Sequence, residues 1–132
     1  MVISHSTAVY RVILLLALVF TTYMATTPDS LFDEFNLGLD LGFEISDKLL
    51  HAVTFCVLLW LADSSWPDSD INMTKVTLLL VYGAMIEIIQ SYLPYRDSSL
   101  LDLVADGVGM SLYPLTIPVL RQLPILGRRW PE

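Results

Sequence analysis

The chain has 132 residues, of which 55% are hydrophobic and only 16% are charged, and its formal net charge is −7. A mean hydropathy of +0.62 with so few charges is atypical of a soluble domain of this size. The negative charge and the scattered basic residues exclude nucleic-acid binding as the function. The composition therefore predicts a small integral membrane protein.

The first long apolar run covers residues 9–25 and is interrupted only by Arg11 and a few threonines. At about 1.5 Å per residue, a helix over about 9–27 nearly spans a hydrocarbon core of about 30 Å. The long side chain of Arg11 can extend to the membrane interface. A cleavable signal peptide is the rival interpretation, but no clear cleavage site with small residues follows the run. We therefore expect an uncleaved membrane anchor.

Three further apolar segments follow, with predicted helices over about 47–63, 74–93 and 102–120. The second segment is short, and it reaches a spanning length only when Asp47 and Lys48 are included as its polar start. The third is long enough to span by itself, and a proline directly after it ends the helix. The chain is thus predicted to be all-α, with four transmembrane helices in a small bundle that forms a single membrane domain over 1–132.

Lysine and arginine positions set the predicted orientation. Arg11 lies near the N-terminal end of the first helix, and three arginines follow the fourth, so an even number of spans places the N- and C-termini together on the cytoplasmic side. The segment 28–46 has five acidic residues and no basic one, as expected for an external loop. Asp63, at the cytoplasmic end of the second helix, is expected to be solvated.

Within the external loop, residues 37–45 read "LGLDLGFEI", in which apolar residues alternate with period two. This is a strand-like pattern, but it is too short and isolated to form a sheet. We expect an extended segment in the membrane interface. A lid over an outward-facing site is the alternative.

Polar side chains recur one helical turn apart on three of the predicted helices. An ionised carboxylate costs about 2.5 to 3.5 kcal/mol at the centre of a spanning helix, so these side chains should face one another rather than lipid. Gly83 and Gly109 on the same faces would allow close helix approach. An arginine in the third connection can close over the acids. The candidate functional polar cluster comprises Asp47, Lys48, His51, Glu87, Gln90, Arg96, Asp102 and Asp106.

Two stretches, "DKLLHAVTF" and "EIIQSYLPYRDSSLLDLVADGVG", resemble the VanZ-like family of small bacterial membrane proteins, and the resemblance covers roughly residues 45–112. The family pattern is D-K-x-x-H-x-x-x-F, then E-x-x-Q with P-x-R, then D-x-x-x-N-x-x-G. Asp106 departs from the pattern, since it stands where the family commonly has asparagine. The positions that match are Asp47, Lys48, His51, Phe55, Glu87, Gln90, Pro94, Arg96, Asp102 and Gly109.

The resemblance implies a multi-pass protein of the bacterial cytoplasmic membrane that acts at the outer leaflet or on cell-envelope material. The family is named for a member associated with teicoplanin resistance, so a link to glycopeptide susceptibility is one implied function. The implied partners are the lipid bilayer and an anionic lipid or a lipid-linked envelope precursor. The resemblance settles neither a mechanism nor an oligomeric state.

Three functions fit the polar cluster, and a fourth is disfavoured. Arg96, Lys48 and His51 could hold an anionic headgroup while the acids orient them. His51 could instead act in a membrane-embedded enzyme, as a general base or metal ligand beside the carboxylates. The cluster could also be a purely structural network. Proton or ion translocation is disfavoured because the inner halves of the helices are nearly all apolar. A single histidine among oxygen ligands is weak support for zinc, so the sequence assigns no metal and no cofactor.

Overall fold

A computed structural model describes residues 5–28, 43–67, 73–120 and 122. Within these residues the chain forms helices α1 (His5–Thr26), α3 (Phe43–Ser65), α4 (Met73–Ser91) and α5 (Leu100–Leu120). The all-helical prediction is confirmed for this part of the chain. Most of the predicted boundaries differ by one to four residues from the structure, as is usual for helix ends.

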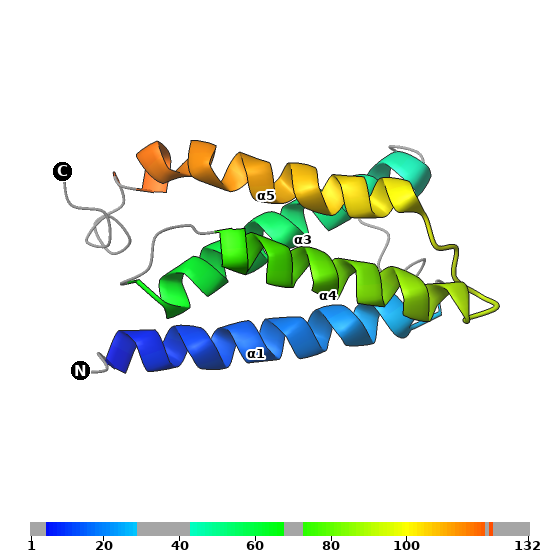
Figure 1. Ribbon diagram of the computed structural model, residues 1–132, viewed down its shortest axis with the longest axis horizontal. Helices are drawn as coiled ribbons and strands as arrows, with labels where there is room; N and C mark the ends of the chain where they lie inside the picture. The colour runs from blue at the N-terminus through cyan, green and yellow to red at the C-terminus, as the bar shows by residue number, and fades with distance from the viewer. Residues whose placement is uncertain (1–4, 29–42, 68–72, 121, 123–132) are drawn as a thin grey trace.

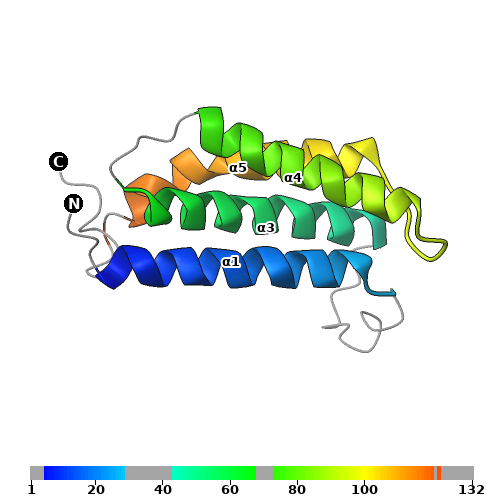
Figure 2. The same cartoon turned by 60° about the horizontal axis from the view of Figure 1, so that its bottom comes forward.

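Successive helices run in opposite directions, so the start of α1 and the end of α5 lie at the same end of the bundle, which we call the terminal end (Figure 1). We call the opposite end, which carries Thr26, Phe43, Ser91 and Leu100, the distal end. Helix α3 lies in the middle of the bundle (Figure 2) and packs against α1, α4 and α5, most extensively against α5. Different residues of α3 therefore contact α1, α4 and α5.

All four described helices are long and apolar enough to cross a membrane. Each also exposes large apolar side chains, among them Leu16 on α1, Leu78 on α4 and Leu115 on α5, with relative exposures of 64%, 65% and 71%. An apolar exterior of this extent suits a chain surrounded by lipid. The structure thus supports a multi-pass membrane protein.

The segment predicted as an external loop ends earlier than expected, because α3 begins at Phe43 instead of Asp47. Residues 43–45, the end of the strand-like pattern, are helical, so the extended conformation is wrong for these three residues. The rest of the pattern, 37–42, lies outside the described residues. A period-two pattern over so few residues is easily overridden by tertiary context.

Two glycines allow the close helix approach that their positions predict. A Cβ atom on Gly109 of α5 would clash with the backbone carbonyl of Ala52 on α3, so these two helices meet backbone to backbone. A Cβ atom on Gly83 of α4 would lie 2.6 Å from Oδ2 of Asp106. Gly109 thus sets the α3–α5 distance, and Gly83 leaves room for an acidic side chain.

An apolar core with Leu58, Leu59, Leu79 and Met110 lies inside the bundle. A second polar cluster lies toward the terminal end, where Asp63 accepts hydrogen bonds from Lys75 Nζ at 2.9 Å and from the Tyr113 hydroxyl at 2.7 Å. The prediction that Asp63 is solvated is wrong, since its relative exposure is 2%. The reason is that partners from α4 and α5 reach it, and a buried carboxylate requires such partners.

Candidate functional site

The distal end gathers the polar side chains that the sequence singled out. Helix α3 supplies Asp47, Lys48 and His51 in its second and third turns, and α5 supplies Asp102 and Asp106. Glu87 and Gln90 come from the last turns of α4, and Arg96 comes from the connection between α4 and α5. The contacts divide these eight residues into smaller groups with different roles.

His51 and Asp106 form the central contact of the site. His51 Nδ1 lies 2.8 Å from Asp106 Oδ1, across the α3–α5 interface. The side chain of Asp106 is 1% exposed and that of His51 is 15% exposed. An ionised carboxylate only accepts hydrogen bonds, so with Asp106 ionised the proton lies on Nδ1 and Nε2 is directed elsewhere.

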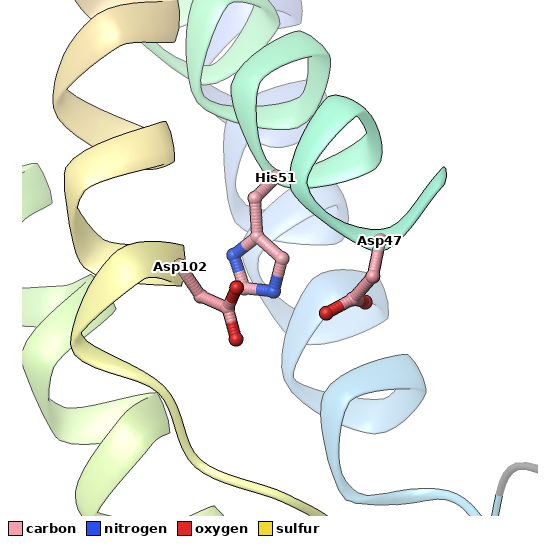
Figure 3. Close-up of side chains that lie close together, drawn as sticks. All are labelled: Asp47, His51 and Asp102. Carbon is pink, nitrogen blue, oxygen red and sulfur yellow. The ribbon is translucent and has the colours of Figure 1, made fainter. Parts of the chain in front are cut away.

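Asp47 and Asp102 flank the same imidazole. One ligand-type atom from each of Asp47, His51 and Asp102 lies within 4.8 Å of the others. Figure 3 shows the His51 ring between the two carboxylates, with Asp47 one turn earlier on α3 and Asp102 on α5. Lys48 Nζ lies 3.6 Å from Asp102 Oδ1, which is an ion pair longer than a hydrogen bond.

Glu87 connects α4 to the start of α5. Its Oε2 accepts a hydrogen bond of 2.9 Å from the backbone N–H of Ser99. The hydroxyl oxygen of Ser99 in turn accepts a hydrogen bond of 3.2 Å from the N–H of Leu101, as an N-cap residue does. Glu87 therefore orders the connection that leads into the Asp102 turn.

Gln90 connects α4 to α1. Its Nε2 donates a 2.9 Å hydrogen bond to the carbonyl oxygen of Ala25, and the side chain is almost fully buried. This leaves the carbonyl oxygen of the amide group for another donor.

Arg96 lies in the α4–α5 connection and is half-buried. Burial lowers the pKa of its guanidinium from the ordinary value, while the charge of nearby Asp102 raises it in the opposite direction. An arginine keeps its positive charge through shifts of this kind. The guanidinium of Arg96 thus keeps a permanent positive charge beside the carboxylates of the site.

A pocket of about 170 Å³ opens among these side chains. Five of the eight predicted residues line it, and Lys48, Glu87 and Asp102 do not. Its remaining wall is largely apolar, with contributions from α1, α3 and α4. The polar lining residues from the predicted cluster are Asp47, His51, Gln90, Arg96 and Asp106, and the apolar ones include Phe20, Met24, Leu50, Phe55 and Ile86.

Several buried acceptor oxygens accept no hydrogen bond within the described part of the chain. They are Glu87 Oε1, Gln90 Oε1, Asp102 Oδ1 and Asp106 Oδ2. A buried acceptor left without a donor costs about 1 to 3 kcal/mol, so a set of them at one end of a bundle indicates a place for donors or positive charge. All four lie on residues of the predicted cluster.

Comparisons with family models, with curated proteins and with solved structures gave no significant match to this chain.

Helix α1 is the part of the pocket that the sequence did not predict. Phe20, Thr21, Met24 and Ala25 form one wall of it. These side chains are apolar or weakly polar, and they look like ordinary residues of a membrane span. Their role depends on how α1 packs, and no local pattern carries that information.

Proposed function

We propose that this protein is an integral membrane protein of the cell envelope that binds a phosphate-bearing amphipathic lipid, either an anionic lipid or a lipid-linked envelope precursor, at its distal end. The observation that carries the proposal is the pocket, where Arg96 lies with Asp47, His51, Gln90 and Asp106 beside a wall that is otherwise largely apolar. A guanidinium pairs well with phosphate oxygens, and the apolar wall suits hydrocarbon.

The size of the pocket restricts what can enter it. A dry cavity of about 150 Å³ can hold a benzene molecule, so a pocket of about 170 Å³ takes a headgroup or a short piece of chain, and not a whole lipid. The acyl or prenyl chain would lie along the apolar exterior of the helices, within the bilayer. This mode of binding suits a protein that recognises the headgroup and its attachment point.

The polar lining adds donor recognition to phosphate recognition. Gln90 Oε1 and Asp106 Oδ2 are buried acceptors without donors in the described structure. Hydroxyl or ammonium groups of a headgroup are suitable donors. The proposed ligand therefore carries both a phosphate and hydrogen-bond donors.

The resemblance to the VanZ-like pattern also favours work at the outer leaflet, with the distal end outside and both termini in the cytoplasm. On this proposal the protein resides in a bacterial cytoplasmic membrane. An effect on teicoplanin-type susceptibility would follow if its ligand contributes to access of the drug to the envelope. Deleting the protein and measuring glycopeptide susceptibility tests that consequence separately from lipid binding.

The purified chain in detergent can be tested by native mass spectrometry against phosphatidylglycerol, a polyprenyl phosphate and, as a lipid without net charge, phosphatidylcholine. We expect retention of one of the first two lipids and loss of retention in Arg96→Ala. Arg11→Ala is the matched control, because it removes a guanidinium at the terminal end, where Arg11 Nε donates to the Ser65 carbonyl oxygen. Equal retention of all lipids, or equal loss in both variants, would sink the proposal and leave the cluster as a structural network.

An enzyme is the second candidate function, and the His51–Asp106 contact of 2.8 Å favours it. A carboxylate that accepts from Nδ1 leaves Nε2 as a general base, and His51 lines the pocket where a substrate could lie. Incubation of the bound lipid with wild-type protein and with His51→Gln, followed by mass analysis of the lipid, tests this candidate. A lipid that emerges unchanged from the wild-type protein argues for binding alone.

A further inference from the structure

We infer that Asp47, His51 and Asp102 form a binding site for a divalent cation of the first transition row, with Asp106 as the outer partner that orients His51. The three potential ligands come from two helices and lie within 4.8 Å of one another. Ligand atoms around one tetrahedral ion are about 3.3 to 3.6 Å apart, since each metal–ligand bond is about 2.0 to 2.2 Å. An approach of about 1 Å by the most distant ligand atom, through side-chain rotation, therefore brings the three onto one ion.

The backbone already holds these ligands in place. Asp47 and His51 are one helical turn apart on α3, and Asp102 approaches from α5 (Figure 3). The two helices meet backbone to backbone where Gly109 packs against Ala52. Such contact fixes the separation of the two ligand-bearing helices.

His51 has the outer-shell partner that metal-binding histidines usually have. Its Nδ1 is bonded to Asp106, so Nε2 is the nitrogen left to bind an ion, and it lies on the side of the ring toward Asp47 (Figure 3). A carboxylate on the far nitrogen of a metal-bound imidazole fixes the tautomer and increases the basicity of the ligand. Asp106 is 1% exposed and accepts no hydrogen bond at its other oxygen within the described residues.

The unsatisfied groups around the cluster call for the same occupant. Asp102 Oδ1, Asp106 Oδ2 and Gln90 Oε1 are all acceptors without a hydrogen-bond donor in the described chain. A divalent cation supplies positive charge to Asp102 Oδ1, and water molecules in the pocket that Gln90 and Asp106 line can donate to the other two. The pocket beside Asp47 and His51 has space for those waters or for an oxygen atom of a ligand. An ion with three protein ligands and an open position is typical of sites that act on a bound molecule.

Lys48 lies beside Asp102, one of the three proposed ligands. Its Nζ is 3.6 Å from Asp102 Oδ1, and its side chain is 33% exposed. An ion pair of this length, made by a flexible and partly exposed side chain, is weak. A divalent cation would displace the ammonium from Asp102, so Lys48 competes with the metal.

The ligand types restrict the metal. One imidazole with two carboxylates suits Mn²⁺, Fe²⁺ or Zn²⁺, whereas Mg²⁺ and Ca²⁺ favour oxygen ligands alone. Zn²⁺ should bind more tightly than Mn²⁺, following the general order of affinity for such sites. The role of this ion in ligand binding rests on the proposed function. An ion here would also coordinate a phosphate oxygen, and its positive charge would allow an anionic headgroup to bind at a site rich in carboxylates.

The test uses the full chain in detergent after removal of metal with a chelator. Mn²⁺ is titrated and the free ion is followed by electron paramagnetic resonance, with Zn²⁺ as competitor and no lipid added. We expect one tightly bound Mn²⁺ that Zn²⁺ displaces, loss of binding in His51→Ala and Asp102→Asn, and a decrease of about 10- to 100-fold in affinity in Asp106→Leu. Asp97→Asn is the matched control, because this exposed acid lies in the α4–α5 connection.

Lys48→Met supplies a readout that misfolding cannot imitate, since we expect tighter Mn²⁺ binding than in the wild-type chain. Absence of stoichiometric binding, or binding that survives both His51→Ala and Asp102→Asn, would overturn the metal site. Lipid retention measured with a chelator present reports on the proposed function alone. Failure of one proposal is thereby separated from failure of the other.

Discussion

Asp106 Oδ1 and His51 Nδ1 lie 2.8 Å apart in the interior of a bundle that is long and apolar enough to cross a membrane. The contact joins α3 to α5, the helix pair with the most extensive packing. Both residues also line the pocket. The same pair of side chains thus joins two helices and shapes the pocket.

Replacing Asp106 by leucine should destabilise the fold, because His51 loses its buried partner. Removing one member of a buried pair costs about 3 to 5 kcal/mol. Asp106→Asn should cost less, about 1 kcal/mol, because the amide oxygen can still accept from Nδ1. The free energy of unfolding in mixed micelles, titrated with sodium dodecyl sulfate, measures both. Equal destabilisation by the two variants would contradict a hydrogen-bonding role for Oδ1.

Gly109→Ala should destabilise the bundle by about 1 to 3 kcal/mol through overpacking against the Ala52 carbonyl. Gly107→Ala is the matched control on the same helix. A Cβ atom at Gly107 would lie 4.0 Å from Leu80 Cδ2, an ordinary contact. Since alanine is the better helix former by about 1 kcal/mol, the control should be neutral or stabilising. The same unfolding titration checks both, and a neutral Gly109→Ala would show that α3 and α5 are not in backbone contact.

The terminal-end cluster should be structural, with no part in ligand binding. Lys75→Met leaves Asp63 without a 2.9 Å ion pair and should cost about 3 to 5 kcal/mol. The double variant Asp63→Asn/Lys75→Met should recover most of this loss, because it buries no charge and keeps an amide oxygen that accepts from the Tyr113 hydroxyl. A double-mutant cycle on unfolding free energies measures the coupling. Mn²⁺ or lipid binding that changed in the folded double variant would contradict the assignment.

Glu87→Leu should loosen the α4–α5 connection, because the Ser99 N–H loses its 2.9 Å acceptor. Glu87→Gln keeps an acceptor oxygen and should resemble the wild-type chain. Amide hydrogen exchange of residues 95–99 measures the change, and we expect faster exchange only in Glu87→Leu. Unchanged protection in Glu87→Leu would show that the connection is ordered by other contacts.

The sequence was sufficient to predict the helices, because long apolar runs leave a membrane-spanning chain few alternatives. It also indicated that Asp47 and His51 share one face and that Asp102 and Asp106 share another, since helical periodicity is a local property. The pairings between helices were not predictable. Nothing local indicates that Lys48 would approach Asp102 while His51 contacts Asp106, which depends on the rotation of α3 against α5.

The burial of Asp63 was also not predictable from the sequence. It follows an apolar run, as a solvated helix end often does, and only the packing of α4 and α5 reveals its partners Lys75 and Tyr113. The apolar pocket wall from α1 was likewise not predictable, because the same apolar residue types face a pocket and face lipid.

The way α1 is attached has a consequence for sequence variation. Three side chains from the rest of the bundle donate to its backbone carbonyl oxygens: Tyr82 to Leu18, Gln90 to Ala25 and Tyr95 to Thr26. Main-chain acceptors persist through most substitutions of the residues that carry them. A saturation mutagenesis scan should therefore find α1 the most permissive helix for apolar exchanges, while the three donors tolerate few replacements. Diversity along α1 would then reshape the pocket wall without altering how the helix is anchored, so that related chains could accommodate different ligands on a common frame.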